Sequence, residues 1–398
     1  MPFKFSCDNL SMRCVTCFII LCALWGSACT PEPQQIEKKI REYQYQRALH
    51  PNNVEIYYQL GHAHLMLGRY EQGVSYLKDA VRLSKKHALA HRDLGWALYQ
   101  LQDYRAAEPW LLEALEMRPR DRSILSSLSA VYIGQKRYQD VVDLLKPFVD
   151  TGRGTVPIHN NLAAAYRHLK LYPLAIEQLK QALENNPDSA ELHNSLGVVF
   201  GKPGQSEQAV AEYRTALALD PGYGSAHFNL AVALTRQGRS DEALEHFHFA
   251  QQENPADPEI QAGLGWTYHQ LNRYLIAISY YKEAARLAPS NLQVQQALGE
   301  LWDITQHYDR AIDAYEMAAG LDPETPDNYY HLGRLYNQLK AGEKAVVHMA
   351  LAESLYRKRR NSEMEEHCRK NISILAGKYH FKKEQLHRLT QPQSSMTS

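Results

Sequence analysis

The chain has 398 residues, of which 44% are hydrophobic, and its 44 basic side chains balance 44 acidic ones to a formal net charge of zero. That length exceeds what one hydrophobic core normally serves, so we expect several cores or an extended architecture. Because no excess of positive charge is present, the composition argues against a nucleic-acid-binding protein and against attraction of the whole chain to an anionic surface.

The segment before Cys29 has the pattern of an export signal. Arg13 precedes an uncharged stretch, Cys14 to Ala28, that is shorter than the roughly 20 residues a bilayer span needs. Most of the cysteines lie in or directly after this segment, and no disulfide or zinc spacing follows from them. A basic start, a short apolar centre and small residues at the end predict a secretory signal over 1–28.

The signal ends in a pattern that resembles the lipobox of bacterial lipoproteins. Gly26, Ser27 and Ala28 lead to Cys29, although Gly26 stands where the lipobox prefers leucine. The resemblance implies lipidation at Cys29 and a location in the cell envelope, anchored to the outer or inner membrane and facing the periplasm. Plain cleavage, an uncleaved anchor and a buried N-terminal helix are the alternatives.

Two further features of this end follow from the sequence. Met12 before Arg13 makes a complete signal by itself, so translation can begin at Met1 or at Met12. The segment 29–35 reads as a polar tether, and the segment 36–53 as an N-terminal helix.

A leucine followed by a small residue then returns at a constant interval along the chain. The leucines are Leu60, Leu94, Leu128, Leu162, Leu196, Leu230, Leu264, Leu298 and Leu332. An alanine follows most of them at a second constant distance, as at Ala80, Ala114, Ala182, Ala216, Ala250, Ala284, Ala318 and Ala352. Such a fixed period indicates a chain built from stacked repeats.

Each unit has the pattern of two helices. Leu94, Leu98 and Leu101 share one helical face, and the turn follows at Gln102. Small residues are needed where two helix backbones cross closely. One such pair cannot bury its own apolar face, so neighbouring units must stack.

These features are similar to the tetratricopeptide repeat, which also favours an aromatic residue three positions beyond the small one. The resemblance implies an all-α, right-handed superhelical solenoid of nine helix-turn-helix repeats over 54–359. The predicted repeats are 54–87, 88–121, 122–155, 156–189, 190–223, 224–257, 258–291, 292–325 and 326–359. A C-terminal capping helix over 360–389 and a disordered tail over 390–398 follow.

The third repeat departs from the pattern. Val141 and Phe148 replace alanines, and Pro147 falls within the second helix, where a proline removes a hydrogen bond. We therefore expect a hinge at 146–156.

No catalytic constellation stands out, and the segment 360–398 after the last repeat is too short for a catalytic domain, so we expect a non-enzymatic protein without a cofactor or metal. His91, His159, His193 and His227 recur at one place in the repeat, but metal bonds of about 2 Å cannot span stacked helices. Helix packing is the simpler interpretation. The basic run 357–360 reads as a solvated helix end, with contact to anionic lipid or phosphate as the alternative.

In the family, the first helices form a concave wall that binds partners. The corresponding places here include Tyr58, His62, Trp96, Tyr99, Asn160, Arg167, Asn194, Phe228, Arg236, Trp266, Tyr330 and Arg334. Exposed aromatic residues near arginine are typical of binding hot spots, so Trp96 and Trp266 are expected on this wall. The alternative is that both tryptophans pack against neighbouring repeats.

The sequence thus predicts a membrane-anchored scaffold that binds protein or peptide partners in its groove and organises an envelope complex for secretion, pilus or cell-wall assembly. This last step is an analogy at the level of the fold. Two alternatives stay open: a carbohydrate-binding scaffold in polysaccharide export, and an uncleaved inner-membrane assembly factor. The sequence leaves the oligomeric state open.

The anchor prediction has a direct test. Cys29→Ser should move the protein from the membrane fraction to the soluble fraction, because the lipidated side chain is lost. Fractionation of host cells and the intact mass of the product check this. A variant that stays in the membrane fraction at precursor mass would show that Cys29 is not the anchor.

Overall fold

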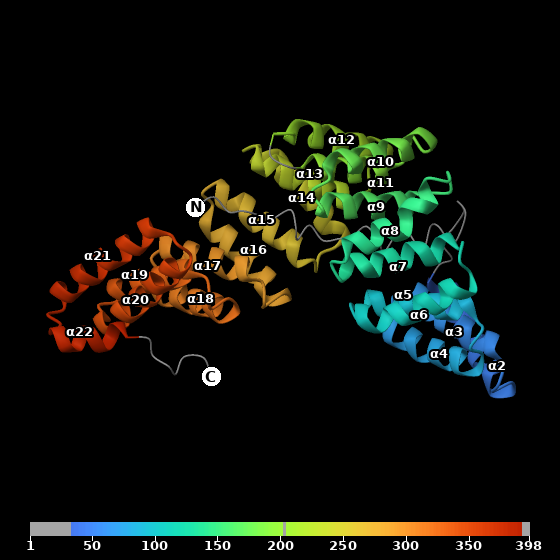
Figure 1. The fold of residues 1–398 in the computed structure, drawn as a ribbon, viewed down its shortest axis with the longest axis horizontal. Coiled ribbons are helices and arrows are strands. Elements are labelled where there is room, and N and C mark those ends of the chain that lie inside the picture. Colours follow the sequence, from blue (N-terminus) through green and yellow to red (C-terminus); the bar gives the residue numbers. More distant parts are fainter. Residues whose placement is uncertain (1–32, 202–203, 392–398) are drawn as a thin grey trace. The chain divides into compact units, whose positions relative to one another are not determined.

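The computed structural model describes residues 33–201 and 204–391, and all regular structure in these ranges is α-helical (Figure 1). The predicted signal, Cys29 and most of the predicted tail lie outside them. The helices are α2 (Pro33–Leu49), α3 (Val54–Met66), α4 (Tyr70–Leu83), α5 (Ala88–Gln100), α6 (Tyr104–Met117), α7 (Arg122–Gly134), α8 (Tyr138–Val149), α9 (Val156–His168), α10 (Tyr172–Asn185), α11 (Ala190–Phe200), α12 (Ser206–Leu219), α13 (Gly224–Arg236), α14 (Ser240–Glu253), α15 (Pro258–Gln270), α16 (Tyr274–Leu287), α17 (Leu292–Ile304), α18 (Tyr308–Leu321), α19 (Pro326–Gln338), α20 (Gly342–Lys358), α21 (Ser362–Lys378) and α22 (Lys383–Thr390).

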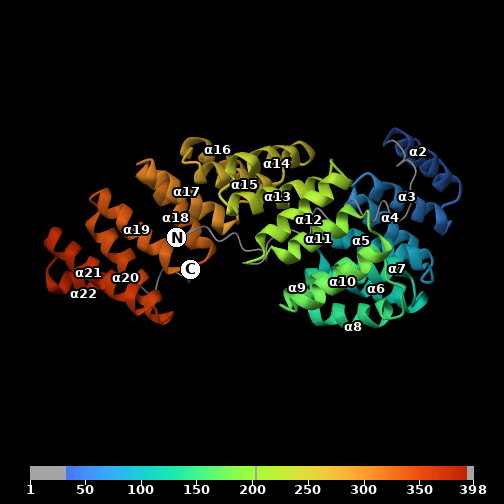
Figure 2. The same ribbon diagram turned by 90° about the horizontal axis from the view of Figure 1, so that it is seen from above.

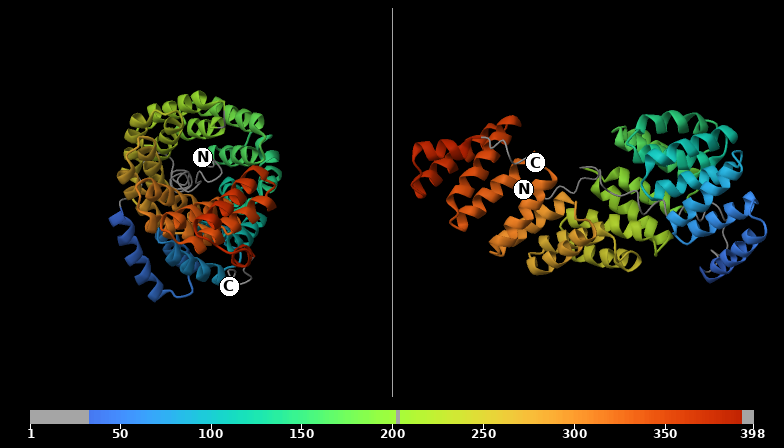
Figure 3. Two further views of the ribbon diagram at one scale, coloured as in Figure 1. Left: turned by 90° about the vertical axis from the view of Figure 1, so that its left-hand side faces the viewer. Right: turned by 90° about the horizontal axis from the view of Figure 1, so that it is seen from below.

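The described chain forms two compact units. Unit 1 runs to Asn229 and unit 2 begins at Leu230, so the boundary falls inside α13. In unit 1, α3 packs on α4, α5 on α6, and α4 on α5, and Figure 2 shows these helices side by side in chain order. In unit 2, α17 to α20 pack in the same alternating way (Figure 3, orange to red). The all-helical fold of consecutive packed pairs is therefore confirmed, whereas the count of nine repeats stays a prediction.

The small residue after each leucine makes room for a large side chain on the second helix of the same pair. A Cβ atom built on Gly95 would lie 2.5 Å from Leu111 Cγ, and one on Gly197 would lie 2.5 Å from Tyr213 Cε1. Real Cβ atoms do not approach so closely, so any larger residue would separate the two helices. The alanines of the second helix are almost fully buried, as at Ala114 and Ala182. The close crossing of the two helices thus explains why a small residue recurs after each leucine and why alanine recurs on the second helix.

The turn between the two helices also recurs once in each interval, in a left-handed backbone conformation. The residues with positive φ at this place are Gly68, Gln102, Lys136, Lys170, Gly204, Gly238, Asn272, Gln306 and Lys340. The left-handed conformation costs a non-glycine residue about 1–2 kcal/mol. Hydrogen bonds that close the helix end offset this cost; for example, Arg137 N donates to Tyr132 O at 2.8 Å.

The hinge expected at 146–156 is wrong as a division of the chain, because the compact units divide at Asn229 and Leu230. Helix α8 continues through Pro147 to Val149, with 12 residues against 14 in α10. Across this place α8 packs on α9, and Asn161 Nδ2 donates to Ser129 Oγ at 2.8 Å. These contacts keep the third and fourth predicted repeats in one unit.

Both ends differ from the predicted bounds. Helix α2 begins at Pro33, so residues 33–35 of the expected tether are helical, and it ends at Leu49 rather than continuing to 53. Ile36 and Ile40 of α2 pack in a core with Ile56 of α3.

At the other end, the expected single capping helix is two helices, α21 and α22, separated by a turn with a positive φ at His380. Cys368, Ile372, Leu375 and Leu389 from these helices join the core of α18 to α20. Thr390, expected in the tail, is the last residue of α22. Among the described helices, none combines the length and apolar composition that a bilayer crossing requires.

Gly265→Ala should destabilise unit 2, because a Cβ there would lie 2.9 Å from Cγ of the fully buried Tyr281. We expect a loss of about 1–3 kcal/mol, measured by urea unfolding, with lost hydrogen-exchange protection concentrated in α15 and α16.

The matched control is Gly320→Ala in α18, where a Cβ would meet no atom within 4 Å. It should leave stability unchanged or raise it by up to about 1 kcal/mol, because alanine is the better helix former. Equal losses in the two variants would contradict the close crossing.

Candidate functional site

The first helices of the pairs in unit 1, α3, α5, α7, α9 and α11, form a row in which each helix contacts the next. We call this the first-helix row. Polar side chains connect its members from end to end. Asn161 of α9 bonds to Ser126 and Ser129 of α7, and Asn194 Oδ1 of α11 accepts from Asn229 Nδ2 at 2.9 Å. The row is therefore fixed by hydrogen bonds as well as by apolar packing.

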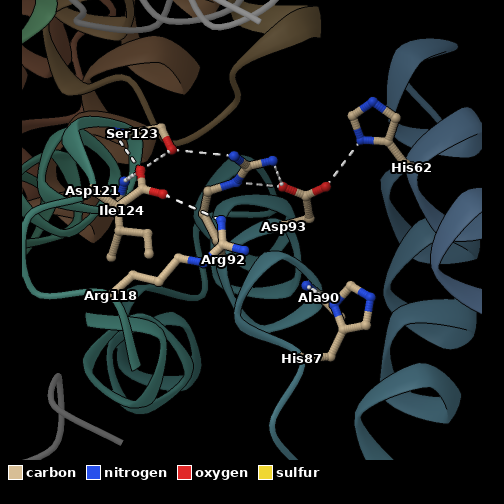
Figure 4. Close-up of polar contacts among 9 residues, drawn as sticks. All are labelled: His62, His87, Ala90, Arg92, Asp93, Arg118, Asp121, Ser123 and Ile124. Carbon is tan, nitrogen blue, oxygen red and sulfur yellow. Dashed lines mark hydrogen bonds and ion pairs between the residues drawn. The ribbon is translucent and has the colours of Figure 1, made fainter. Parts of the chain in front are cut away.

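The densest part of the row is a buried network across α3, α5 and α7 (Figure 4). His62 Nδ1 lies 2.9 Å from Asp93 Oδ2, and Arg92 Nε donates to Asp93 Oδ1 at 2.7 Å. Arg92 Nη1 then donates to Ser123 Oγ at 3.1 Å. Asp121 caps α7 by accepting from the backbone N–H of Ser123 at 3.0 Å. Three consecutive first helices are thus joined through one arginine and one aspartate.

The charges in this network support one another. Burial alone would raise the pKa of Asp93, but the positive charge of Arg92 and the hydrogen bond from His62 outweigh it and hold the pKa below its usual value. Burial raises the pKa of the Tyr58 hydroxyl, and the charge of Asp93 raises it further. Removing one partner of such a buried pair typically costs about 3–5 kcal/mol. The Arg92–Asp93 pair therefore holds the register of the helices through its bonds to His62 and Ser123, and it is largely closed to a ligand.

A second polar contact joins α9 and α11. Asn160 Nδ2 donates to Glu191 Oε1. Burial raises the pKa of Glu191 to about 7, although the hydrogen bond from Asn160 opposes the shift. A protonated carboxyl can donate a hydrogen bond, and Asn160 Oδ1 has no partner among the described residues. Glu191 is thus a carboxyl in the row whose charge changes near neutral pH.

In unit 2, polar contacts again join successive first helices. Thr235 and Thr267 hydroxyls lie 2.9 Å apart, and Gln296 Nε2 donates to Asn328 Oδ1 at 2.8 Å. Arg334 lies 3.8 Å from Asp303, with its side chain 48% exposed, so this ion pair is weak. Arg334 is available to an outside partner.

The structure places the predicted wall residues at different depths. Tyr58, Trp96, Asn160, Asn194 and Trp266 are buried; His62, Tyr99, Arg167, Phe228 and Tyr330 are half-buried; Arg236 and Arg334 are exposed. The expectation that Trp96 and Trp266 are exposed is wrong, since they keep only 8% and 5% of their accessible surface. The Trp96 ring meets Tyr70 of the preceding pair edge-on at 5.8 Å, so it packs against the neighbouring repeat. Whether any of these residues contacts a partner stays a prediction.

Sequence reasoning missed Arg92, Asp93 and Glu191. Arg92 stands at the same place of its repeat as Tyr58 and Asn160. Choosing wall residues by their place in the repeat therefore also selects Arg92. Charged neighbours inside an otherwise apolar helix are the signal for a buried pair. For Glu191 no such signal exists, because its pKa depends on burial between two helices.

The recurring histidines serve packing within unit 1. His91 Nε2 lies 3.1 Å from Glu113, and His193 Nδ1 lies 2.7 Å from Glu212. His227 Nε2 lies 3.0 Å from the carbonyl oxygen of Pro221, in the loop just before its own helix. Gln261 bonds to Pro255 O in the same way in unit 2. In the described part of the chain, no three His, Cys, Asp or Glu side chains gather as metal ligands would.

The basic run at the end of α20 is engaged within unit 2. Arg357 pairs with Glu353 at 2.7 Å, and Lys358 Nζ lies 2.7 Å from Glu324 Oε2. Arg359 donates to the backbone oxygen of Glu324 at 2.7 Å. The bonds to Glu324 connect the end of α20 to the loop before α19, so these basic residues stabilise the packing of unit 2.

Comparisons with known proteins agree with this architecture. Two family models match: one described as tetratricopeptide repeat matches residues 58–122, 199–258 and 236–291, and one described as TPR repeat matches 163–204. No curated protein matches the chain.

Many solved structures are similar to this chain, and two of them illustrate the range of the likeness. A chain of the APC/C hetero-tetramer Cut9–Hcn1 is 13% identical with a TM-score of 0.55, covering 83% of this chain and 81% of its own. The pilF protein of Pseudomonas aeruginosa is 23% identical with a TM-score of 0.49, covering 54% of this chain and 97% of its own.

Glu191→Gln should change stability in a pH-dependent way. Because the folded pKa is raised to about 7, the stability that protonated Glu191 contributes is fully present below its ordinary pKa of 4.5 and is lost as pH rises through 7. Glutamine cannot ionise, so the variant should be more stable than the parent at pH 8 by about 1 kcal/mol or more. The advantage should shrink towards pH 5.

Urea unfolding followed by hydrogen exchange in α9 and α11 checks this. Glu184→Gln on the exposed side of α10 is the control, and its effect should not vary with pH in the same range. A constant difference between parent and Glu191→Gln from pH 5 to pH 8 would contradict the raised pKa.

Proposed function

Because the chain belongs to the tetratricopeptide-repeat family, whose members typically mediate protein–protein interactions and are generally non-catalytic, we propose that it is a non-enzymatic scaffold that binds a protein or peptide. In unit 1 the binding surface is the first-helix row, and in unit 2 the first helices α15, α17 and α19 form a separate candidate surface. Buried hydrogen bonds join the helices of the row, and other polar side chains of the first helices are half-buried or exposed.

The observation that carries this proposal is that hydrogen-bonded first helices carry arginine side chains that keep part of their surface exposed. The bonds of Asp93 to His62 and of Arg92 to Ser123, together with the Asn194–Asn229 contact, hold neighbouring first helices in register. Arg167 of α9 in unit 1 is half-buried, and the side chain of Arg334 of α19 in unit 2 is 48% exposed. A surface that needs little rearrangement loses little conformational entropy on binding, and arginine is among the residues that dominate binding energy.

We also propose that the chain is exported and lipid-anchored at Cys29, and that it organises an envelope complex for secretion, pilus or cell-wall assembly. The support is the apolar segment and the small residues that end at Cys29. The alternative of carbohydrate binding needs flat aromatic faces open to solvent. The burial of Tyr58, Trp96 and Trp266 favours a protein partner over a glycan.

The test uses the tagged chain, captured from its native host after chemical cross-linking, with the partner identified by mass spectrometry. The dissociation constant is then measured with the purified partner. Arg167→Glu and Arg334→Glu should weaken binding at least tenfold, because each places a negative charge on a first helix.

The controls reverse exposed charges on second helices: Lys180→Glu in α10 beside Arg167→Glu, and Lys282→Glu in α16 beside Arg334→Glu. They should change affinity less than twofold. Equal effects in both sets would contradict binding by the first helices, and capture of polysaccharide in place of protein would support the alternative.

A further inference from the structure

Helix α2 is covered on one side only within unit 1. Ile36 and Ile40 face the core with α3, Glu37 pairs with Arg69, and the Arg47 guanidinium lies 5.5 Å from the Tyr76 ring centroid. In Figures 1 and 3, α2 (blue) stands at the end of the helices of unit 1, with no described helix of that unit beyond it. Its other side is therefore an end surface of the unit.

That open side has a definite composition. The residues opposite Ile36 and Ile40 on the helix, at spacings of three and four, are Lys38, Arg41, Tyr45 and Leu49. Tyr45 is 68% exposed and Leu49 is 57% exposed. We call these four residues the outward face of α2. It offers two cations, one aromatic ring and one aliphatic side chain in a single line.

The charge of α2 is positive although the chain as a whole is neutral. Lys38, Lys39, Arg41 and Arg47 stand against Glu37 and Glu42, which leaves four minus two, a formal net charge of +2. Glu42 lies beside the outward face and is the one carboxylate there, while Glu37 is occupied by Arg69. A surface of opposite charge would therefore be attracted to this helix.

Chain length limits what can meet this face. Only residues 30–32 separate Cys29 from Pro33, where α2 begins. Fully extended, the four Cα–Cα steps span at most about 14 Å. A lipid on Cys29 would therefore hold the first residue of α2, Pro33, within about 14 Å of the anchored residue. No other described helix of unit 1 starts so close in sequence to the anchor.

We infer that the outward face of α2 rests on the anionic headgroups of the bilayer in which Cys29 is anchored. This inference rests on the anchoring proposed above and is independent of the groove. Tyrosine and leucine side chains enter the interface between headgroups and acyl chains, where an amphipathic ring is favoured, and lysine and arginine pair with the headgroup phosphates. The contact sets the orientation of unit 1 on the membrane.

The experiment supplies the anchor chemically, so that failure of native lipidation does not affect it. Residues 30–398, which contain every described helix, carry a hexahistidine tag in place of Cys29 and bind vesicles through a nickel-chelating lipid. Tyr45→Cys is labelled with bimane; Cys368 is fully buried and does not compete. The vesicles contain phosphatidylethanolamine and phosphatidylglycerol, with and without brominated acyl chains, and the ratio of fluorescence intensities measures contact.

A label at residue 174, from Leu174→Cys on the exposed side of α10, is the matched control because three predicted repeats separate it from α2. We expect quenching at residue 45 at least twofold greater than at residue 174. Lys38→Glu with Arg41→Glu should abolish the difference, whereas Arg105→Glu with Arg122→Glu, also exposed in unit 1, should preserve it. Raising the salt concentration from about 0.1 M to 1 M should weaken it, because the Debye length falls from about 10 Å to 3 Å.

Three results would overturn the inference. Equal quenching at residues 45 and 174 would show that α2 does not meet the bilayer. Quenching that survives the Lys38→Glu and Arg41→Glu changes would exclude a role for the anionic headgroups. A concentration-dependent dimer in which the label at residue 45 is shielded without vesicles would assign the face to a second copy of the chain.

Discussion

The structure depends on one recurring steric constraint: the two helices of a pair cross so closely that only a small residue fits on the first. Where glycine occupies that place, the second helix fills the space with leucine, tyrosine or methionine, as at Leu77, Tyr281 and Met349. The space that glycine leaves on the first helix is thus filled by a large side chain from the second helix. Dense packing without voids is what stabilises such a pair.

Because each pair is fixed internally, the remaining freedom lies between pairs. Polar side chains on the first helices restrict it, through Asp93 in one place and Asn194 in another. These contacts are directional, whereas apolar packing between helices tolerates sliding. The buried Arg92–Asp93 pair lies within α5, and its bonds to His62 of α3 and Ser123 of α7 fix the register of these three helices. These polar contacts between first helices therefore determine the shape of the proposed binding surface.

The apolar face of the first helix pair and that of the last are covered by different helices. At the C-terminal end, α21 and α22 add Cys368, Ile372 and Leu389 to the last core, ion pairs lie on the outside, and Ile374 stays 66% exposed. At the N-terminal end, α2 covers α3 but leaves Tyr45 and Leu49 exposed. The N-terminal end is the one assigned to a membrane surface because it lies close in sequence to the proposed anchor and because α2 is positively charged.

The sequence by itself determined the repeating architecture. Leucine, small residue and alanine recur at a spacing that only stacked helix pairs satisfy, since the sizes of side chains are local properties that the pattern displays directly. The turn could also be located, although only the backbone revealed that Gln102 and its equivalents are left-handed.

Only the tertiary structure decided which wall residues are open to a partner. Trp96 and Trp266 occupy wall places but are buried, because rings from the adjacent pair or the close crossing of helices fill the space around them. It likewise decided that Pro147 does not divide the chain and that Glu191 titrates near neutral pH. Burial and proximity between helices arise from residues that are far apart in the chain, and a pattern read along the chain contains no measure of them.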